Sequence, residues 1–288
     1  MNQIKLFIEL TRLEKPIGYM LLFWPCAWGL TLAHDFSSNV SNYFFYLLLF
    51  FLGAVLMRSA GCIVNDILDK DFDKKVFRTK NRPITSGKIS TKVAFIYASI
   101  LCLLALLLLL NFNQFTIILA LGSMPLAFTY PLMKRFTYWP QLFLGITFNY
   151  GLILGWTSIK SEMDIAAITF YLGAIFWTLG YDTIYGYQDI KDDEIIGLKS
   201  TSIKFKGKEN KFLLTCYALF IFMFLVGGYL MKLNNVYYFL TIIPFLHLFF
   251  YQIRTFNSKE PLNCLKVFKS NNIFGLIIFL NILIVKNL

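Results

Sequence analysis

Long runs of apolar residues are the feature that most limits what this chain can fold into. A helix needs about 20 mostly apolar residues to cross the hydrocarbon core of a bilayer. Nine stretches approach this length, namely residues 17–34, 42–63, 93–111, 114–132, 140–158, 164–186, 212–231, 235–254 and 271–286. The sequence therefore predicts an all-α, polytopic membrane protein with nine transmembrane helices, forming a single domain over residues 1–288.

The composition agrees with a lipid environment. A soluble domain averages about 45–50% apolar and about 25% charged residues, whereas this chain is 57% apolar and 15% charged. A water-soluble chain could not cover this much Leu and Phe with polar surface. The composition therefore excludes a disordered chain and disfavours a water-soluble enzyme or a solenoid.

The basic residues gather in the connections on one side of the predicted bundle. All but three of the 27 Lys and Arg residues lie in or beside residues 1–16, 64–92, 133–139, 187–211 and 255–270; the exceptions are Lys160, Lys232 and Lys286. The positive-inside rule makes the basic side, with the N-terminus, cytoplasmic. This rule explains the net charge of +11 without a nucleic-acid partner. Since no cleavable signal or transit segment is evident, we expect a multi-pass protein of a bacterial inner membrane.

An acidic cluster follows the second apolar run. It reads Asn65-Asp66-Ile67-Leu68-Asp69-Lys70-Asp71-Phe72-Asp73. If the helix continues through the cluster at about 100° per residue, Asp71 points away from a face shared by the other polar side chains. The shared face would carry Asn65, Asp66, Asp69 and Asp73. The pair Asp69 and Asp73 has the i, i+4 spacing that makes side chains neighbours on a helix.

A second cluster, at the end of the sixth run, repeats this spacing. It begins at Asp182 and includes Asp189 and Asp193, which would share one face of a continuous helix. Asp69 and Asp189 are 120 residues apart, as are Asp73 and Asp193. This offset indicates a direct repeat of a four-helix unit whose two Asp-x-x-x-Asp pairs, here called the first and second Asp motifs, face each other at the cytoplasmic side.

The two Asp motifs predict a site for a metal ion and a diphosphate. Neighbouring carboxylates repel each other and favour a cation between them, and oxygen ligands suit Mg²⁺ together with substrate phosphates. With only 6 Arg against 21 Lys, the arginines near the clusters are informative, because an Arg side chain offers a bidentate fork to phosphate. The candidate diphosphate-binding residues are Arg78, Lys80, Arg82, Arg135 and Lys199. The alternative is a solvated acidic loop without a ligand.

Four stretches resemble the UbiA superfamily of intramembrane aromatic prenyltransferases over about residues 10–210. They are Arg12–Gly18 running into Trp24-Pro25; Met57–Asp66 with Asp69, Asp73, Arg78–Pro83 and Ser86-Gly87; Lys134–Gln141; and Asp182–Tyr185 through Asp189 and Asp193 to Lys199–Thr201. The last three apolar runs match the superfamily only in hydropathy. Within the superfamily, the likeness is greatest to members that prenylate 4-hydroxybenzoate.

The resemblance implies nine helices around a central cavity, with Mg²⁺ and a prenyl diphosphate between the Asp motifs. By position, one Mg²⁺ would be held by Asn65, Asp69 and Asp73 and another by Asp189 and Asp193, while Arg135 would bind the diphosphate. The implied activity is Mg²⁺-dependent transfer of a polyprenyl group from polyprenyl diphosphate to the ring carbon ortho to the hydroxyl of 4-hydroxybenzoate, as in ubiquinone biosynthesis. The four aspartates would be the catalytic residues.

The carboxylate of such an acceptor needs a cation in an apolar surrounding. Arg12 is the first candidate and Arg58 the second, with Asp182 and Tyr185 as further acceptor-site residues. Two other functions stay open. One is a superfamily member with a haem, chlorophyll or naphthoate acceptor. The other is an ion-coupled transporter, which is disfavoured because transporter sites lie near the bilayer midplane.

Overall fold

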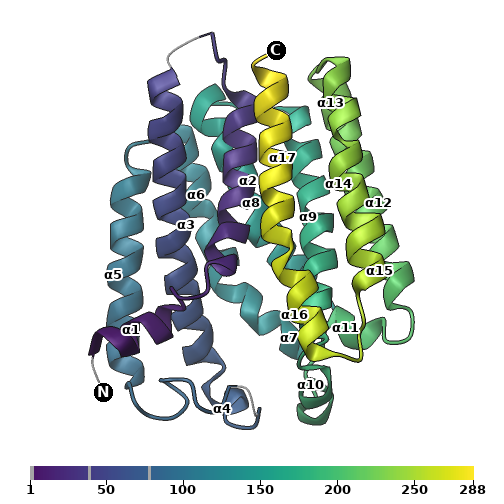
Figure 1. Cartoon of the computed structure of the whole chain (residues 1–288). Coiled ribbons are helices and arrows are strands. Elements are labelled where there is room, and N and C mark those ends of the chain that lie inside the picture. The colour runs from purple at the N-terminus through teal and green to yellow at the C-terminus, as the bar shows by residue number, and fades with distance from the viewer. Residues whose placement is uncertain (1–2, 38–39, 77–78) are drawn as a thin grey trace.

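The computed structural model describes residues 3–37, 40–76 and 79–288, and this part of the chain is built from helices without a β-strand (Figure 1). In chain order the elements are α1 (Gln3–Thr11), α2 (Ile17–Ala33), α3 (Val40–Leu68), α4 (Lys70–Asp73), α5 (Thr91–Leu109), α6 (Gln114–Thr129), η1 (Tyr130–Leu132), α7 (Met133–Phe136), α8 (Pro140–Lys160), α9 (Ile165–Gly186), α10 (Ile190–Ile196), α11 (Thr201–Lys204), α12 (Glu209–Leu230), α13 (Asn235–Leu240), α14 (Ile242–Leu246), the π-helical segment η2 (His247–Gln252), α15 (Ile253–Thr255), α16 (Pro261–Lys269) and α17 (Asn271–Lys286).

The prediction of an all-α, polytopic membrane protein is confirmed. Within the described residues, eight helical stretches are long and apolar enough to cross a membrane: Val40–Leu68, Thr91–Leu109, Gln114–Phe136, Pro140–Lys160, Ile165–Gly186, Glu209–Leu230, Asn235–Thr255 and Pro261–Lys286. Ile17–Ala33, with 17 residues, is a shorter apolar helix that stands beside them (Figure 1). Together these nine stretches correspond to the nine predicted apolar runs.

Polar caps mark where several of the long helices begin. The side chains of Ser90, Asn113, Asp164 and Asn234 each accept a hydrogen bond from a backbone N–H in the first turn of α5, α6, α9 and α13. Such caps satisfy N–H groups that have no partner within the helix. The apolar runs and their polar flanks therefore fix the helix starts locally.

The packing of the helices repeats along the chain. In the first half α3 packs against α2 and α5, and in the second half α9 packs against α8 and α12. The halves meet where α2 lies along α8. The contact is close, because a Cβ on Gly29 of α2 would overlap the carbonyl oxygen of Leu152 on α8.

The connections that follow α3 and α9 lie at the same end of the bundle as the N-terminus, and the C-terminus lies at the opposite end (Figure 1). We call the first of these the motif end. It carries the short helices α4 and α10, each of which begins directly after the first aspartate of an Asp motif and contains the second. The repeat thus brings two acidic segments, far apart in sequence, to one end of the molecule.

Candidate active site

The first Asp motif lies where helix α3 is interrupted. Asn65 and Asp66 belong to the last turns of α3, which ends at Leu68, and Asp69 precedes the four-residue helix α4 with φ −97° and ψ 5°. The prediction of an uninterrupted helix is therefore wrong at Asp69. The amide of Asp73 still donates to the carbonyl of Asp69 at 2.8 Å, so the two motif residues remain one helical turn apart.

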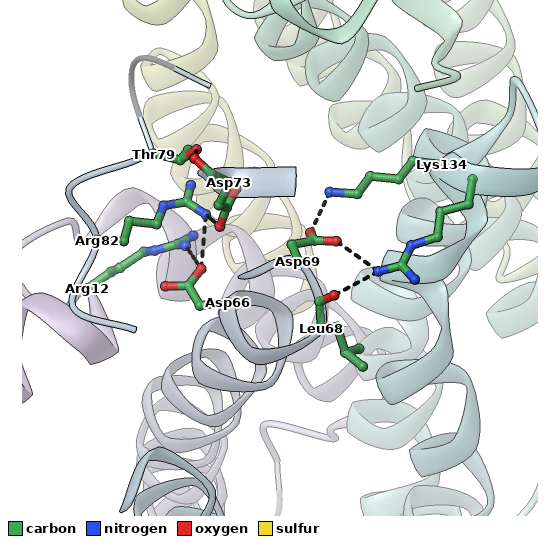
Figure 2. Close-up of polar contacts among 9 residues, drawn as sticks. Arg12, Asp66, Leu68, Asp69, Asp73, Thr79, Arg82 and Lys134 are labelled. Carbon is green, nitrogen blue, oxygen red and sulfur yellow. Dashed lines mark hydrogen bonds and ion pairs between the residues drawn. The ribbon is translucent and has the colours of Figure 1, made fainter. Parts of the chain in front are cut away.

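Basic side chains from two other segments reach the first motif (Figure 2). The Asp69 carboxylate, 1% exposed, pairs with Lys134 of α7 and lies 3.4 Å from Nη2 of Arg135. Arg135 Nη2 also donates to the carbonyl of Leu68 at 2.7 Å. On the other side Arg82 Nη1 lies 2.7 Å from Oδ2 of Asp73. Asp69 and Asp73 thus pair with different basic side chains.

The charges around Asp73 shift the pKa of its carboxyl group in opposite directions. Burial raises the pKa of its carboxyl group, the negative charges of Asp66 and Asp69 raise it further, and Arg82 lowers it. Asp71 differs, since its exposed carboxylate accepts a hydrogen bond from Lys74, and this bond lowers its pKa. The prediction that Asp71 points away from the site agrees with this exposure.

The second Asp motif is also interrupted. Helix α9, which carries Asp182, ends at Gly186, and Asp189 precedes α10 with φ −113° and ψ 7°. The spacing predicted that Asp182, Asp189 and Asp193 share one face of a continuous helix. This prediction is wrong, because the helix is interrupted between Gly186 and Asp189. The amide of Asp193 donates to the carbonyl of Asp189 at 2.9 Å. The second motif thus repeats the backbone geometry of the first.

The short helix α7 connects the two motifs. It offers Lys134 and Arg135 to Asp69, and the backbone carbonyl of Lys134 accepts a hydrogen bond from the amide of Lys199 at 2.8 Å. The ammonium group of Lys199 itself donates to the carbonyl of Phe136 at 3.2 Å and lies above the ring of Tyr138. Lys199 therefore tethers the segment after the second motif to α7.

The four predicted acceptor-site residues lie in one neighbourhood. The guanidinium of Arg58 lies 5.4 Å from the ring centre of Phe148 and interacts electrostatically with Asp182 and Tyr185. Arg12 interacts electrostatically with Arg58 and Tyr185 as well, but it forms an ion pair with Asp66. Within the described residues Arg58 forms no ion pair, which distinguishes it from Arg12.

Some residues fall differently from the sequence expectations. Lys80 is exposed, and Arg78 lies outside the described residues. Lys134 and Asp66 were not among the predicted site residues, although both form ion pairs there. Lys134 could have been found from its position beside Arg135, and Asp66 from its place on the predicted acidic face.

The first motif fits a divalent cation that arrives with a phosphate ligand. Among the described residues, no group of three or more His, Cys, Asp or Glu side chains is arranged to hold a metal ion. Two buried carboxylates, Asp69 and Asp73, lie at i, i+4 with cationic neighbours. Mg²⁺ is commonly bound through one or two carboxylates, with water and substrate phosphates completing its coordination. The oxygen donors suit that ion.

Comparison with known proteins identifies the family from the sequence. The sequence model of the UbiA prenyltransferase family matches residues 22–282. The mitochondrial 4-hydroxybenzoate polyprenyltransferase of Bos taurus is 44% identical over 279 residues, which cover 96% of this chain and 74% of that protein.

Solved structures extend the likeness to the fold. The apo structure of a UbiA homologue from Aeropyrum pernix K1 is 22% identical with a TM-score of 0.77, covering 93% of this chain and 98% of that chain. A UbiA homologue from Archaeoglobus fulgidus bound to GPP and Mg²⁺ is 17% identical with a TM-score of 0.70, covering 98% of this chain and 100% of that chain. At these identities the structural likeness supports the fold alone.

Proposed function

The chain belongs to the UbiA prenyltransferase family, and we propose that it transfers a polyprenyl group from polyprenyl diphosphate to 4-hydroxybenzoate. The product is 3-polyprenyl-4-hydroxybenzoate, a step of ubiquinone biosynthesis. The observation that carries the proposal is a buried pair of carboxylates surrounded by Lys134, Arg135 and Arg82. This arrangement combines oxygen ligands for a hard cation with donors for a diphosphate.

We assign the diphosphate to the space beside the two Asp motifs. Asn65, Asp69 and Asp73 would hold one Mg²⁺, and Asp189 and Asp193 a second. The relative from Archaeoglobus fulgidus that was solved with GPP and Mg²⁺ supports this choice of ion. The proposed diphosphate-binding residues are Arg78, Lys80, Arg82, Arg135 and Lys199. Arg135 is the best placed, because its buried Nε has no hydrogen-bond partner among the described groups.

In the proposed reaction the bond between C1 of the prenyl group and the diphosphate oxygen breaks, and its electron pair stays on the diphosphate. The ring carbon ortho to the hydroxyl forms the new carbon–carbon bond, and the ring proton leaves to a base. Arg82, Lys134 and Arg135 stabilise the charge that develops on the leaving diphosphate. Bound Mg²⁺ supplies further neutralisation of that group.

We assign the acceptor to the neighbourhood of Arg58, with Arg12, Asp182 and Tyr185 around it. A benzoate carboxylate needs a cation in an apolar surrounding. Arg58 provides one above the ring of Phe148, whereas Arg12 already pairs with Asp66. A haem, chlorophyll or naphthoate acceptor remains the alternative within the family.

The chain is a multi-pass membrane protein, and we propose the cytoplasmic membrane of a bacterium as its location. All but three of the 27 basic residues lie in or beside the sequence segments predicted to share the side of the N-terminus, which supports a cytoplasmic N-terminus and active site. The relative from Bos taurus is named as mitochondrial, so the proposed bacterial location differs from the compartment in that name.

Incubation of the purified protein with Mg²⁺, farnesyl diphosphate and 4-hydroxybenzoate tests the proposed function. We expect mass spectrometry of the lipid extract to show farnesylated 4-hydroxybenzoate, with none formed in EDTA and formation restored by Mg²⁺. Parallel reactions with a naphthoate acceptor and with haem separate the alternatives. Formation of the product in the presence of excess EDTA would contradict the metal-dependent mechanism.

A further inference from the structure

Asp66 is a buried charge that the proposed mechanism does not use. Its carboxylate lies in the last turns of α3 and is 1% exposed. Oδ1 accepts hydrogen bonds from Nη2 of Arg12 and, at 3.0 Å, from Nη1 of Arg82 (Figure 2). The same Nη1 of Arg82 lies 2.7 Å from Oδ2 of Asp73. One guanidinium thus bridges a residue of the first Asp motif and a residue outside it.

The second half of the chain shows that the fold does not require an ionic bridge at this position. At the offset of 120 residues that relates the two Asp motifs, Asp66 corresponds to Gly186 and Arg82 to Ser202. In the second half the contact is neutral: Ser202 Oγ donates to the carbonyl of Thr183 at 2.8 Å, and a Cβ on Gly186 would overlap that hydroxyl. Among the described residues, this hydrogen bond joins the segment after the second motif to α9 through neutral groups.

Energetics point in the same direction. A buried ion pair must recover the desolvation cost of both charges, so it contributes little net stability compared with well-packed neutral residues. The second half shows that a neutral contact fits this position of the fold. The charges of Asp66 and Arg82 therefore have a role other than attaching the connection to the helix.

We infer that Asp66 is a positioning residue for the prenyl diphosphate, acting through Arg82. Asp73 pairs with Arg82 and is also a proposed Mg²⁺ ligand, so Arg82 would lose a partner when the carboxylate of Asp73 turns to the ion that arrives with the diphosphate. Asp66 holds the guanidinium in place at that moment, while the other N–H donors of Arg82 are available to phosphate oxygens. This inference rests on the proposed function, because it requires a diphosphate at the first Asp motif.

A double-mutant cycle on substrate affinity tests the inference. We expect Asp66→Asn and Arg82→Gln each to raise the Kd for farnesyl diphosphate with Mg²⁺ about ten-fold, measured by titration calorimetry in detergent, because each change removes a charge-assisted hydrogen bond. The double variant should bind no more weakly than Arg82→Gln alone. Independent effects that multiply in the double variant, or an unchanged Kd in Asp66→Asn, overturn the inference. Asp71→Asn is the matched control, since it neutralises an exposed aspartate of the same cluster.

A second experiment replaces the ionic bridge with the neutral pair and measures stability as well as binding. The variant with both Asp66→Gly and Arg82→Ser copies the pair found in the second half. We expect it to stay folded in the absence of ligand, with a lower unfolding temperature because Arg12 loses its partner Asp66, while its affinity for farnesyl diphosphate falls. A folded variant with wild-type affinity, or one that fails to fold, contradicts a role in binding rather than in structure.

Failure of the proposed function would look different. If the wild-type protein binds farnesyl diphosphate but does not prenylate 4-hydroxybenzoate, the acceptor assignment is wrong and the cycle on Kd still decides the role of Asp66. If the wild type does not bind farnesyl diphosphate with Mg²⁺ at all, the proposed function and this inference both fail.

Discussion

At the scale of single residues, three aspartates within five positions have distinct surroundings. Asp69 and Asp73 are buried and each pairs with a cation from another segment, whereas Asp71 faces solvent and pairs with Lys74 three residues away. The i, i+4 spacing was sufficient to separate Asp71 from the other two. It could not supply the partners, because Lys134 lies 65 residues from Asp69 in the chain.

Replacing the motif aspartates tests this separation. We expect Asp69→Ala, Asp73→Ala, Asp189→Ala and Asp193→Ala each to lower turnover about 100-fold or more, since each removes a proposed metal ligand. Turnover is measured at matched amounts of membrane-inserted protein. Asp71→Ala serves as the control and should stay close to the wild type. If it proves as damaging as Asp69→Ala, exposure does not distinguish the two positions.

Arg135→Lys tests whether the geometry of the guanidinium matters beyond its charge. Nη2 donates to the carbonyl of Leu68, and a single ammonium group cannot make this contact and also offer a fork to phosphate. We expect the KM for the prenyl diphosphate to rise about ten-fold. Arg254→Lys, at the end of α15 beside the ring of Phe250, is the control substitution. Wild-type kinetics in Arg135→Lys would leave Arg135 as a topology determinant only.

At the scale of helices, the apolar runs predicted the membrane-spanning elements well and the short elements poorly. Helix α7 has four residues and no periodic pattern of its own, yet it connects the two motifs. The interruptions at Asp69 and Asp189 each depend on the backbone angles of one residue. Sequence periodicity averages over several turns, so it does not register a change at a single position.

Helix packing at the junction of the two halves has a specific test. A Cβ on Gly29 would overlap backbone atoms of Leu152, so the helices α2 and α8 must move apart to accept it. We expect Gly29→Ala to reduce the free energy of unfolding by about 1–3 kcal/mol, seen as a lower unfolding temperature in detergent. Gly122→Ala in α6 is the control, because nothing lies within 4 Å of its added Cβ. Equal stability of the two variants would contradict close packing at Gly29.

At the scale of the whole molecule, the charge asymmetry predicts the orientation in the membrane. Lys88 lies in the connection after the first Asp motif, and Glu162 lies between α8 and α9 at the opposite end. In a variant without its native cysteines, expressed in a bacterium, we expect a membrane-impermeant maleimide to label Glu162→Cys in intact cells. It should label Lys88→Cys only in inside-out vesicles. The reverse pattern would place the motif end outside the cell.

The neutral contact between Gly186 and Ser202, set against the ionic bridge between Asp66 and Arg82, has a consequence for substrate polarity. Two identical half-sites facing each other would bind a diphosphate equally well in either direction, and the hydrocarbon tail would then emerge on either side. Such degeneracy would leave half of the bound molecules with their reactive carbon away from the acceptor. Because Asp66 and Arg82 are charged where Gly186 and Ser202 are neutral, the two directions differ in energy. In the proposed site, broken symmetry between similar halves is what selects a single direction for the tail.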